Sequence, residues 1–166
     1  MKDIARWSLV LTLLVCPGSS GPAASSVPSK PQLRLARRLA EADELRSACR
    51  AAQLQGAWAA TFGKYNGARW SPSKVLGFRL TIEGERYQVK SGESGEAGTY
   101  RLPAGHALDI MPATGSLASE VVRAVYRVDA DCLMLCLAAP GESRPVEFSA
   151  EPGSEQILIV LRPIEP

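Results

Sequence analysis

Residues 54–58 read LQGAW, and they lie where a charged segment gives way to short stretches of alternating residues. From Trp58 onward the apolar residues recur at every second position, which is typical of strands with one buried face. A glycine at position 56 lets the chain bend without a Cβ clash, so that the indole of Trp58 can plug one end of a closed sheet. Arg162 lies in the last apolar stretch, which must pair with the first to close such a sheet. We therefore expect Gly56, Trp58 and Arg162 to form the floor of a β-barrel, with the Arg162 cation over the indole.

The alternating pattern continues to the C-terminus, with turn residues between its stretches and no intervening helix. The turn EGER at 83–86 joins two such stretches into a hairpin, and SGESGEAG at 91–98 is expected to be a mobile hairpin loop. Eight or nine short strands favour closure, because closure removes exposed sheet edges. The sequence thus predicts an all-β fold, an antiparallel up-and-down barrel of about eight strands over residues 55–163.

Large side chains dominate the positions that should face the interior of this barrel. They favour a barrel that is filled or has only a small cavity. Leu76 is expected to share one strand face with Phe78, Leu80 and Ile82. The full interior set is Phe62, Phe78, Leu80, Tyr87, Tyr100, Leu108, Tyr126 and Leu135.

The N-terminus has the features of a secretory signal peptide, namely a short charged opening, an apolar run and then small residues. The run from Trp7 to Cys16 is too short to cross a bilayer as a helix, which needs roughly 20 residues. Val15 stands where a lipoprotein signal carries a small residue, which disfavours lipid attachment at Cys16. We expect residues 1–26 to be a cleaved signal peptide, residues 27–31 to be a flexible tether, and the mature protein to be secreted or periplasmic.

Between the tether and the barrel, apolar residues recur at spacings of three and four, which predicts an amphipathic helix over residues 32–54. Its acidic residues disfavour a membrane-surface role. The stretches CLMLCLA and ILIVLR are apolar on both faces, so something must cover them. We expect the helix to dock on the barrel over Cys132, Met134 and Cys136. A disulfide from Cys49, on the apolar face of the helix, to Cys132 or Cys136 is an open alternative.

Charge and the single histidine argue against nucleic-acid binding and most catalysis. Without the signal peptide the chain carries 17 basic and 16 acidic residues, a balance that lacks the basic face that phosphates require. Acid–base, nucleophilic and metal chemistry would all depend on His106. A zinc site from His106, Asp109, Cys132 and Cys136 lacks the usual ligand spacing, and the acidic pairs in the EGE and DAD turns fit turn geometry. We expect no catalytic residue, no metal, no cofactor and no enzymatic activity.

More specific motifs lie in LQGAW and in the C-terminal part of the chain. They are LMLC at 133–136, PGESRPVEF at 140–148 and PGS at 152–154. With these motifs the chain resembles a family of small secreted domains of unknown function, found chiefly in planctomycete bacteria and regarded as lipocalin-like. The resemblance covers about residues 45–163 and implies a lipocalin-like barrel, but the family offers no activity to carry over. The chain departs from the family at 104–125, which is less polar, and at Met134, where lysine is common.

The first long loop, KYNGARWSPSK at 64–74, should lie at the barrel mouth opposite Trp58. There Trp70 could stack on a sugar or cap an apolar ligand. We therefore expect non-enzymatic binding of a small apolar ligand. The alternative is a structural or envelope-associated module with a solid barrel that contacts other proteins. The ligand-binding candidates are Trp70, Tyr65, Phe78, Tyr87, Tyr100 and Tyr126.

Overall fold

The computed structural model describes residues 30–115, 117–118 and 120–164. The predicted signal peptide, 1–26, lies outside the described residues. Of the predicted tether, residues 30 and 31 are described, and both belong to the helix. The elements are α1 (Lys30–Leu54), β1 (Gly56–Tyr65), β2 (Ala68–Arg69), α2 (Pro72–Gly77), β3 (Phe78–Glu83), β4 (Arg86–Ser91), β5 (Ser94–Arg101), β6 (Ala107–Pro112), β7 (Val122–Asp129), β8 (Cys132–Leu137) and β9 (Ile157–Pro163).

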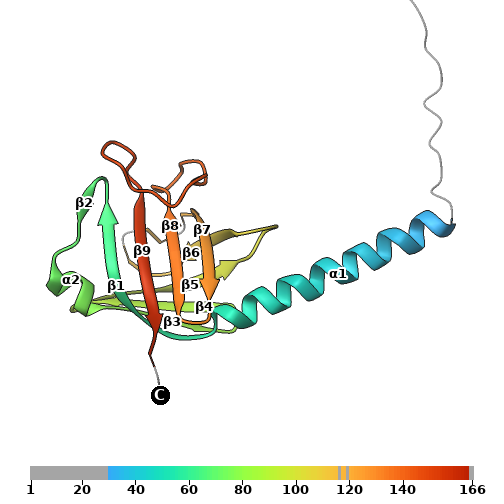
Figure 1. Ribbon diagram of the computed structural model, residues 1–166, viewed down its shortest axis with the longest axis horizontal. Helices are drawn as coiled ribbons and strands as arrows, with labels where there is room; N and C mark the ends of the chain where they lie inside the picture. The colour runs from blue at the N-terminus through green and yellow to red at the C-terminus, as the bar shows by residue number, and fades with distance from the viewer. Residues whose placement is uncertain (1–29, 116, 119, 165–166) are drawn as a thin grey trace, which may run out of the picture.

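Eight of these strands form a closed antiparallel barrel (Figure 1). β1 pairs with β3, each strand from β3 to β9 pairs with its neighbours in chain order, and β9 pairs back with β1. The two-residue β2 only extends the free end of β1. This arrangement confirms the predicted up-and-down barrel of about eight strands preceded by one helix.

The end of the barrel next to α1 is closed by residues around the LQGAW stretch. Trp58 is buried, and its indole N–H donates to the carbonyl of Leu54 at 3.0 Å. Gly56 has φ +113°, a conformation that favours glycine, so its predicted role in bending the chain has a structural basis. The side chain of Gln55 accepts from the Gly84 N–H at 2.7 Å and donates to the hydroxyl of Tyr100 at 3.1 Å, tying the helix end to the β3–β4 turn.

The predicted contact between Arg162 and Trp58 is wrong. Pairing of β1 with β9 sets Arg162 opposite Ala59 and sets Pro163 opposite Trp58. Because neighbouring positions on a strand face opposite sides, Arg162 lies on the outer face, where it is exposed. The last residue of α1, Leu54, packs with Trp58 in the core instead.

A β-bulge in β1 reverses the faces of that strand halfway along its length. The register with β9 shifts between Ala60 and Phe62, so Thr61 is the extra residue. Trp58 and Ala60 are buried before the bulge, but after it Gly63 is buried and Phe62 is not. The ring of Phe62 lies beneath the Arg69 guanidinium, 5.3 Å away, so the prediction that Phe62 faces the interior is wrong.

The predicted docking of the helix over β8 is also wrong. α1 projects away from the barrel (Figure 1), and Leu54 is its only buried residue. Leu35, Leu39 and Leu45 on its apolar face are 57–68% exposed. The helix therefore meets the barrel through its last turn.

The segment between β8 and β9, residues 138–156, supplies part of the cover that the helix was expected to give. Cys136 is fully buried, and its thiol donates to the carbonyl of Ser149 at 3.1 Å. Ala150 in the same segment is also fully buried. Cys49 is exposed and all three described cysteines are free, which contradicts the suggested disulfide.

Two predicted local structures differ from those observed. The stretch SGESGEAG is mostly strand rather than loop, since β5 begins at Ser94 and pairs with β4 through a two-residue turn. Leu76 lies in α2, where it is 72% exposed, rather than on the inner face of β3. A serine N-cap at Ser71 and a proline at the first helical position explain why a helix forms there.

Candidate ligand-binding site

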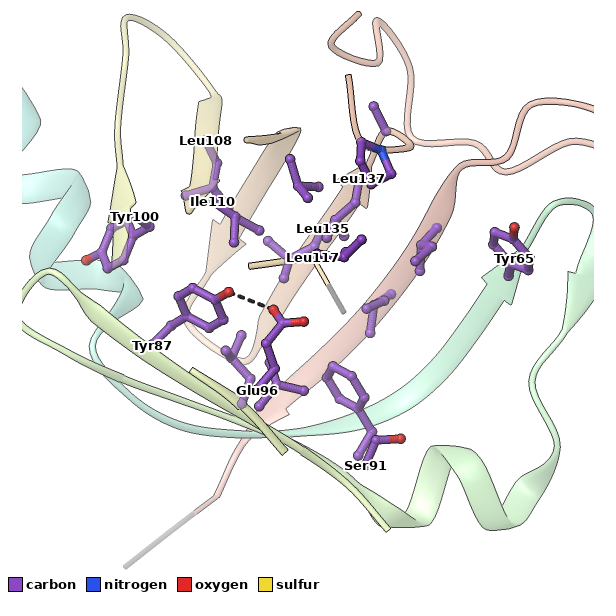
Figure 2. A pocket seen from close by; sticks show the side chains of 18 of the residues that line it. Tyr65, Tyr87, Ser91, Glu96, Tyr100, Leu108, Ile110, Leu117, Leu135 and Leu137 are labelled. Atoms are coloured by element: carbon purple, nitrogen blue, oxygen red, sulfur yellow. Dashed lines mark hydrogen bonds between the residues drawn. The ribbon is translucent and has the colours of Figure 1, made fainter. Parts of the chain in front are cut away.

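The barrel encloses a cavity of about 590 Å³ that opens at the end opposite α1 (Figure 2). Its lining runs from Leu54 at the closed end to the exposed residues Tyr65, Lys74 and Glu155 at the mouth. Between them the walls are mostly aliphatic, with Ile110, Leu135 and Leu137 among the side chains that face inward. The volume falls within the range of roughly 300–1,000 Å³ that is usual for small-molecule sites.

The expectation of a filled or small-cavity barrel is therefore wrong. The bulge in β1 replaces an inward phenyl group at position 62 with the bare backbone of Gly63. Medium-sized residues such as Val89, Val122 and Ile157 also line the interior, and they leave space that larger side chains would fill.

Trp70 forms one side of the mouth. Its ring packs so closely over Gly63 that a Cβ there would lie 2.2 Å from the indole, and its backbone N–H donates to the Gly63 carbonyl at 2.9 Å. The ring also contacts Phe78, with centroids 5.3 Å apart, and the Lys74 ammonium lies 4.5 Å from its centroid. The indole Nε1 is buried and has no hydrogen-bond partner among the described residues.

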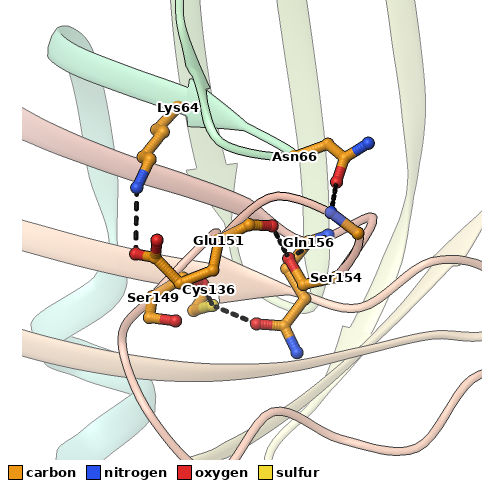
Figure 3. A network of polar contacts seen from close by, with 8 residues as sticks. Lys64, Asn66, Cys136, Ser149, Glu151, Ser154 and Gln156 are labelled. Carbon is orange, nitrogen blue, oxygen red and sulfur yellow. Dashed lines mark hydrogen bonds and ion pairs between the residues drawn. The ribbon is translucent and has the colours of Figure 1, made fainter.

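Polar contacts tie the 138–156 segment to the end of β1 at the mouth (Figure 3). Asn66, at the end of β1, accepts from the Gly153 N–H at 2.5 Å, and Lys64 pairs with Glu151 at 3.0 Å. Beneath them the thiol of Cys136 bonds to Ser149, and burial raises its pKa. These contacts fix the segment that carries Glu155 and Pro140 to the rim of the cavity.

A polar pair lies inside the otherwise apolar walls. The hydroxyl of Tyr87 donates to Glu96 Oε1 at 2.6 Å (Figure 2). Gly98 makes this contact possible: it faces Tyr87 across the β4–β5 pairing, and a Cβ there would lie 2.9 Å from the tyrosine ring. Burial first, and then the hydrogen bond and charge of Glu96, raise the pKa of Tyr87 well above its usual value, so the phenol stays a neutral donor.

The tyrosines nearer the floor are tied into the protein. The Tyr100 hydroxyl donates to the Gly84 carbonyl at 2.9 Å, and burial raises its pKa. Tyr126 is 1% exposed, its hydroxyl has no partner within the described ranges, and burial raises its pKa too. Its ring contacts that of His106 edge-on, with centroids 6.0 Å apart. His106 is exposed and is not part of the cavity lining.

The structure brings five of the six predicted ligand-binding residues to the cavity. Tyr65, Trp70, Phe78, Tyr87 and Tyr100 line it, whereas Tyr126 lies outside the lining. Whether any of them contacts a ligand stays a prediction.

Sequence reasoning missed Glu96, because the glycines and serines around it predict a loop. The signal that could have found it is the alternation of Glu96, Gly98 and Tyr100, which places all three on one strand face.

Asp109 and Cys136, two of the four residues of the disfavoured zinc site, are engaged elsewhere. Asp109 pairs with Arg144, and Cys136 is covered by the 138–156 segment. In the part of the chain that the structure describes, no group of three His, Cys, Asp or Glu residues is arranged to hold a metal ion. Nor does any described helix have the length and apolar character needed to cross a membrane.

Comparison with sequence profiles of protein families finds no match, and comparison with curated proteins finds none. Among solved structures, the chain is similar to a lipocalin-like protein from Bacteroides uniformis ATCC 8492, at 12% sequence identity and a TM-score of 0.47. The similarity covers 68% of this chain and 99% of that protein. The strand pairing by itself establishes that the barrel is closed.

Proposed function

We propose that this protein is a secreted, non-enzymatic binding protein that holds a small, largely apolar molecule inside its barrel. The observation that carries the proposal is the cavity of about 590 Å³, with apolar walls and one open end. Burial of an apolar ligand there is expected to be favourable at about 25 cal/mol per Å² of apolar surface removed from water. Secretion and kinship with the planctomycete-type domains are proposed on the signal-peptide pattern and the motifs of the sequence.

Trp70 supports this function from the mouth of the cavity. Its half-buried side chain lines the cavity and adds apolar surface that an entering molecule can contact.

A second role, in contacts with other proteins, is favoured by α1. The exposed Leu35, Leu39 and Leu45 give this helix an uncovered apolar stripe. This second role does not include the solid barrel that the sequence suggested, because the barrel has a cavity. A structural or envelope-associated role for α1 is compatible with ligand binding in the barrel.

The proposal is tested with N-phenyl-1-naphthylamine, an uncharged apolar dye that fluoresces when it leaves water. Wild-type protein should bind it saturably with one site. Ile110→Trp, which narrows the cavity with a bulky ring, should weaken binding, whereas Thr99→Trp, on the exposed face of β5, should not. Absence of saturable binding, or equal binding by Ile110→Trp in a variant that still unfolds cooperatively, would overturn the proposal. Native mass spectrometry of protein from its own host would then give the mass of the natural ligand.

A further inference from the structure

We infer that the ligand of this cavity is a cationic amphiphile, an apolar molecule whose amine or similar N–H group pairs with the carboxylate of Glu96. This inference rests on the proposed function, since it names the chemical class of ligand for the same cavity. It is carried by the placement of one acidic side chain within apolar walls.

Glu96 lies inside the barrel rather than on its rim. It shares the inner face of β5 with Gly98 and Tyr100, and Figure 2 shows its carboxylate pointing into the cavity beside Leu117 and Ile110. The other charged lining residues, Lys74 and Glu155, are exposed at the mouth. A ligand deep enough to fill the cavity must therefore meet Glu96.

The protein satisfies only part of the hydrogen-bonding capacity of this carboxylate. Oε1 accepts from the Tyr87 hydroxyl, whereas no described hydrogen bond reaches Oε2. Oε2 is not among the buried unpartnered atoms, so it faces the open space of the cavity, where an ionised carboxylate offers free acceptor sites to a ligand. No lysine or arginine among the described residues forms an ion pair with Glu96. A cationic N–H group on the ligand would supply both the missing donor and the missing charge.

Tyr87 leaves the charge of Glu96 without compensation. Its hydroxyl donates its only proton to Glu96, and Gly98 lets its ring lie where that hydrogen bond can form. A phenol that stays neutral cannot supply the positive charge that Glu96 lacks. The pair is therefore an acceptor site that selects against a carboxylate or phosphate headgroup placed in the interior.

The competing arrangement is an anionic amphiphile with its headgroup at Lys74. The Lys74 ammonium already lies over the Trp70 ring, and the lining as a whole carries two acidic residues against this one base. An anion held at Lys74 would also leave Glu96 facing the apolar tail. The charges of the lining thus favour a cation.

The test compares three probes that share a twelve-carbon chain: dodecylammonium, dodecanol and dodecanoate. Each is tested for displacement of N-phenyl-1-naphthylamine from wild-type protein at neutral pH, below the micelle concentration of the two ionic probes and below the solubility limit of dodecanol. Dodecylammonium should bind at least tenfold more tightly than dodecanol, and dodecanoate should bind most weakly. Glu96→Gln, which keeps an acceptor for Tyr87, should weaken dodecylammonium about tenfold and leave dodecanol unchanged. Glu83→Gln, which neutralises an exposed acid of β3 outside the cavity lining, is the matched control and should change amine binding less than twofold. Glu155→Gln, at the mouth, tests whether the amine is held there instead.

The outcomes separate this inference from the proposed function. If the dye and all three probes fail to bind, both are wrong. If the probes bind equally, or dodecanoate binds best, the cavity binds ligands but the inference is overturned, and this comparison needs no variant. Loss of amine affinity in Glu155→Gln but not in Glu96→Gln would also overturn it. A urea midpoint close to that of wild type establishes that Glu96→Gln is folded, and Glu96→Lys should reverse the order of amine and carboxylate.

Discussion

Gly98 is a position in β5 where the barrel leaves no room for a side chain. It lies in the middle of β5 with ordinary extended backbone, so its conformation does not demand glycine. A Cβ at this position would lie 2.2 Å from the Met111 carbonyl oxygen, 2.9 Å from Pro112 Cα and 2.9 Å from the Tyr87 ring. Two of these three atoms are backbone, and they cannot rotate away.

Replacing Gly98 with alanine should therefore destabilise the protein. Overpacking of a tight interior costs about 1–3 kcal/mol, and this site belongs near the upper end because β6 itself must move. Removing glycine from a strand returns about 0.5–1 kcal/mol. The expected net loss is about 2 kcal/mol, which at an m-value of about 2 kcal/mol per molar lowers the urea midpoint by about 1 M.

Gly95→Ala in the same strand is the matched control. There the nearest atom to a Cβ would be the Val89 carbonyl oxygen at 3.6 Å, an ordinary contact, so this variant should be as stable as wild type or slightly more. Unfolding in urea is followed by the fluorescence of the buried Trp58 and of Trp70. If Gly98→Ala unfolds at the same urea concentration as Gly95→Ala, the close approach of β5, β6 and the Tyr87 ring is refuted.

Other perturbations test the barrel, its buried titratable groups and the helix. Arg144 donates to two backbone carbonyls and pairs with a half-buried aspartate, so Arg144→Ala should cost about 2–3 kcal/mol in urea unfolding, against less than about 1 kcal/mol for the exposed ion-paired Arg127→Ala. Burial raises the pKa of Cys136 and of Tyr87, Tyr100 and Tyr126. The stability that these neutral groups contribute is therefore complete below about pH 8.5 and is lost as the pH rises toward their native pKa values. An unchanged urea midpoint from about pH 7.5 to about pH 10.5 would contradict this. In native protein, iodoacetamide should label Cys49 much faster than Cys136, as read by peptide mass spectrometry, and equal rates would refute the burial of the latter. Residues 30–48 of α1 include no buried residue, so deleting them should move the urea midpoint by less than about 0.3 M.

Strand alternation and turn spacing were enough to predict the barrel. The apolar positions from Phe78 to Ile82 and from Val122 to Tyr126 repeat every second residue, and that period has one physical meaning in strands with one buried face. Closure followed from the need to remove sheet edges. The position of Trp70 opposite Trp58 then followed from topology alone.

The failures have a common physical origin in long-range contacts. The bulge at Thr61 depends on how β1 meets β9, so the alternation within β1 could not show that Phe62 turns outward. The cover on Cys136 comes from a segment that is polar and rich in turn residues, which hid its role. The apolar stripe of α1 predicted a buried face, but periodicity cannot tell which partner, if any, lies against it.

The candidate site was predicted in part, since its aromatic residues stand out and its acid does not. Glu96 lies among glycines and serines that favour a loop, and only its spacing from Tyr100 shows the strand. The hydrogen bond from Tyr87 to Glu96 depends on the β4–β5 register, which the two-residue turn sets. The glycines and serines of this stretch hide that register in the sequence.

Pairing of β1 with β9 also dictates when the protein can fold. The two strands lie roughly 100 residues apart, and folds dominated by such distant pairings form in milliseconds to seconds rather than microseconds. Until β9 pairs, β1 keeps one strand edge free. Over the same interval β8, which β9 covers on one edge in the finished sheet, leaves the apolar edge of CLMLCL open to other chains. Docking of β9 is therefore the step that protects two strand edges from aggregation at once.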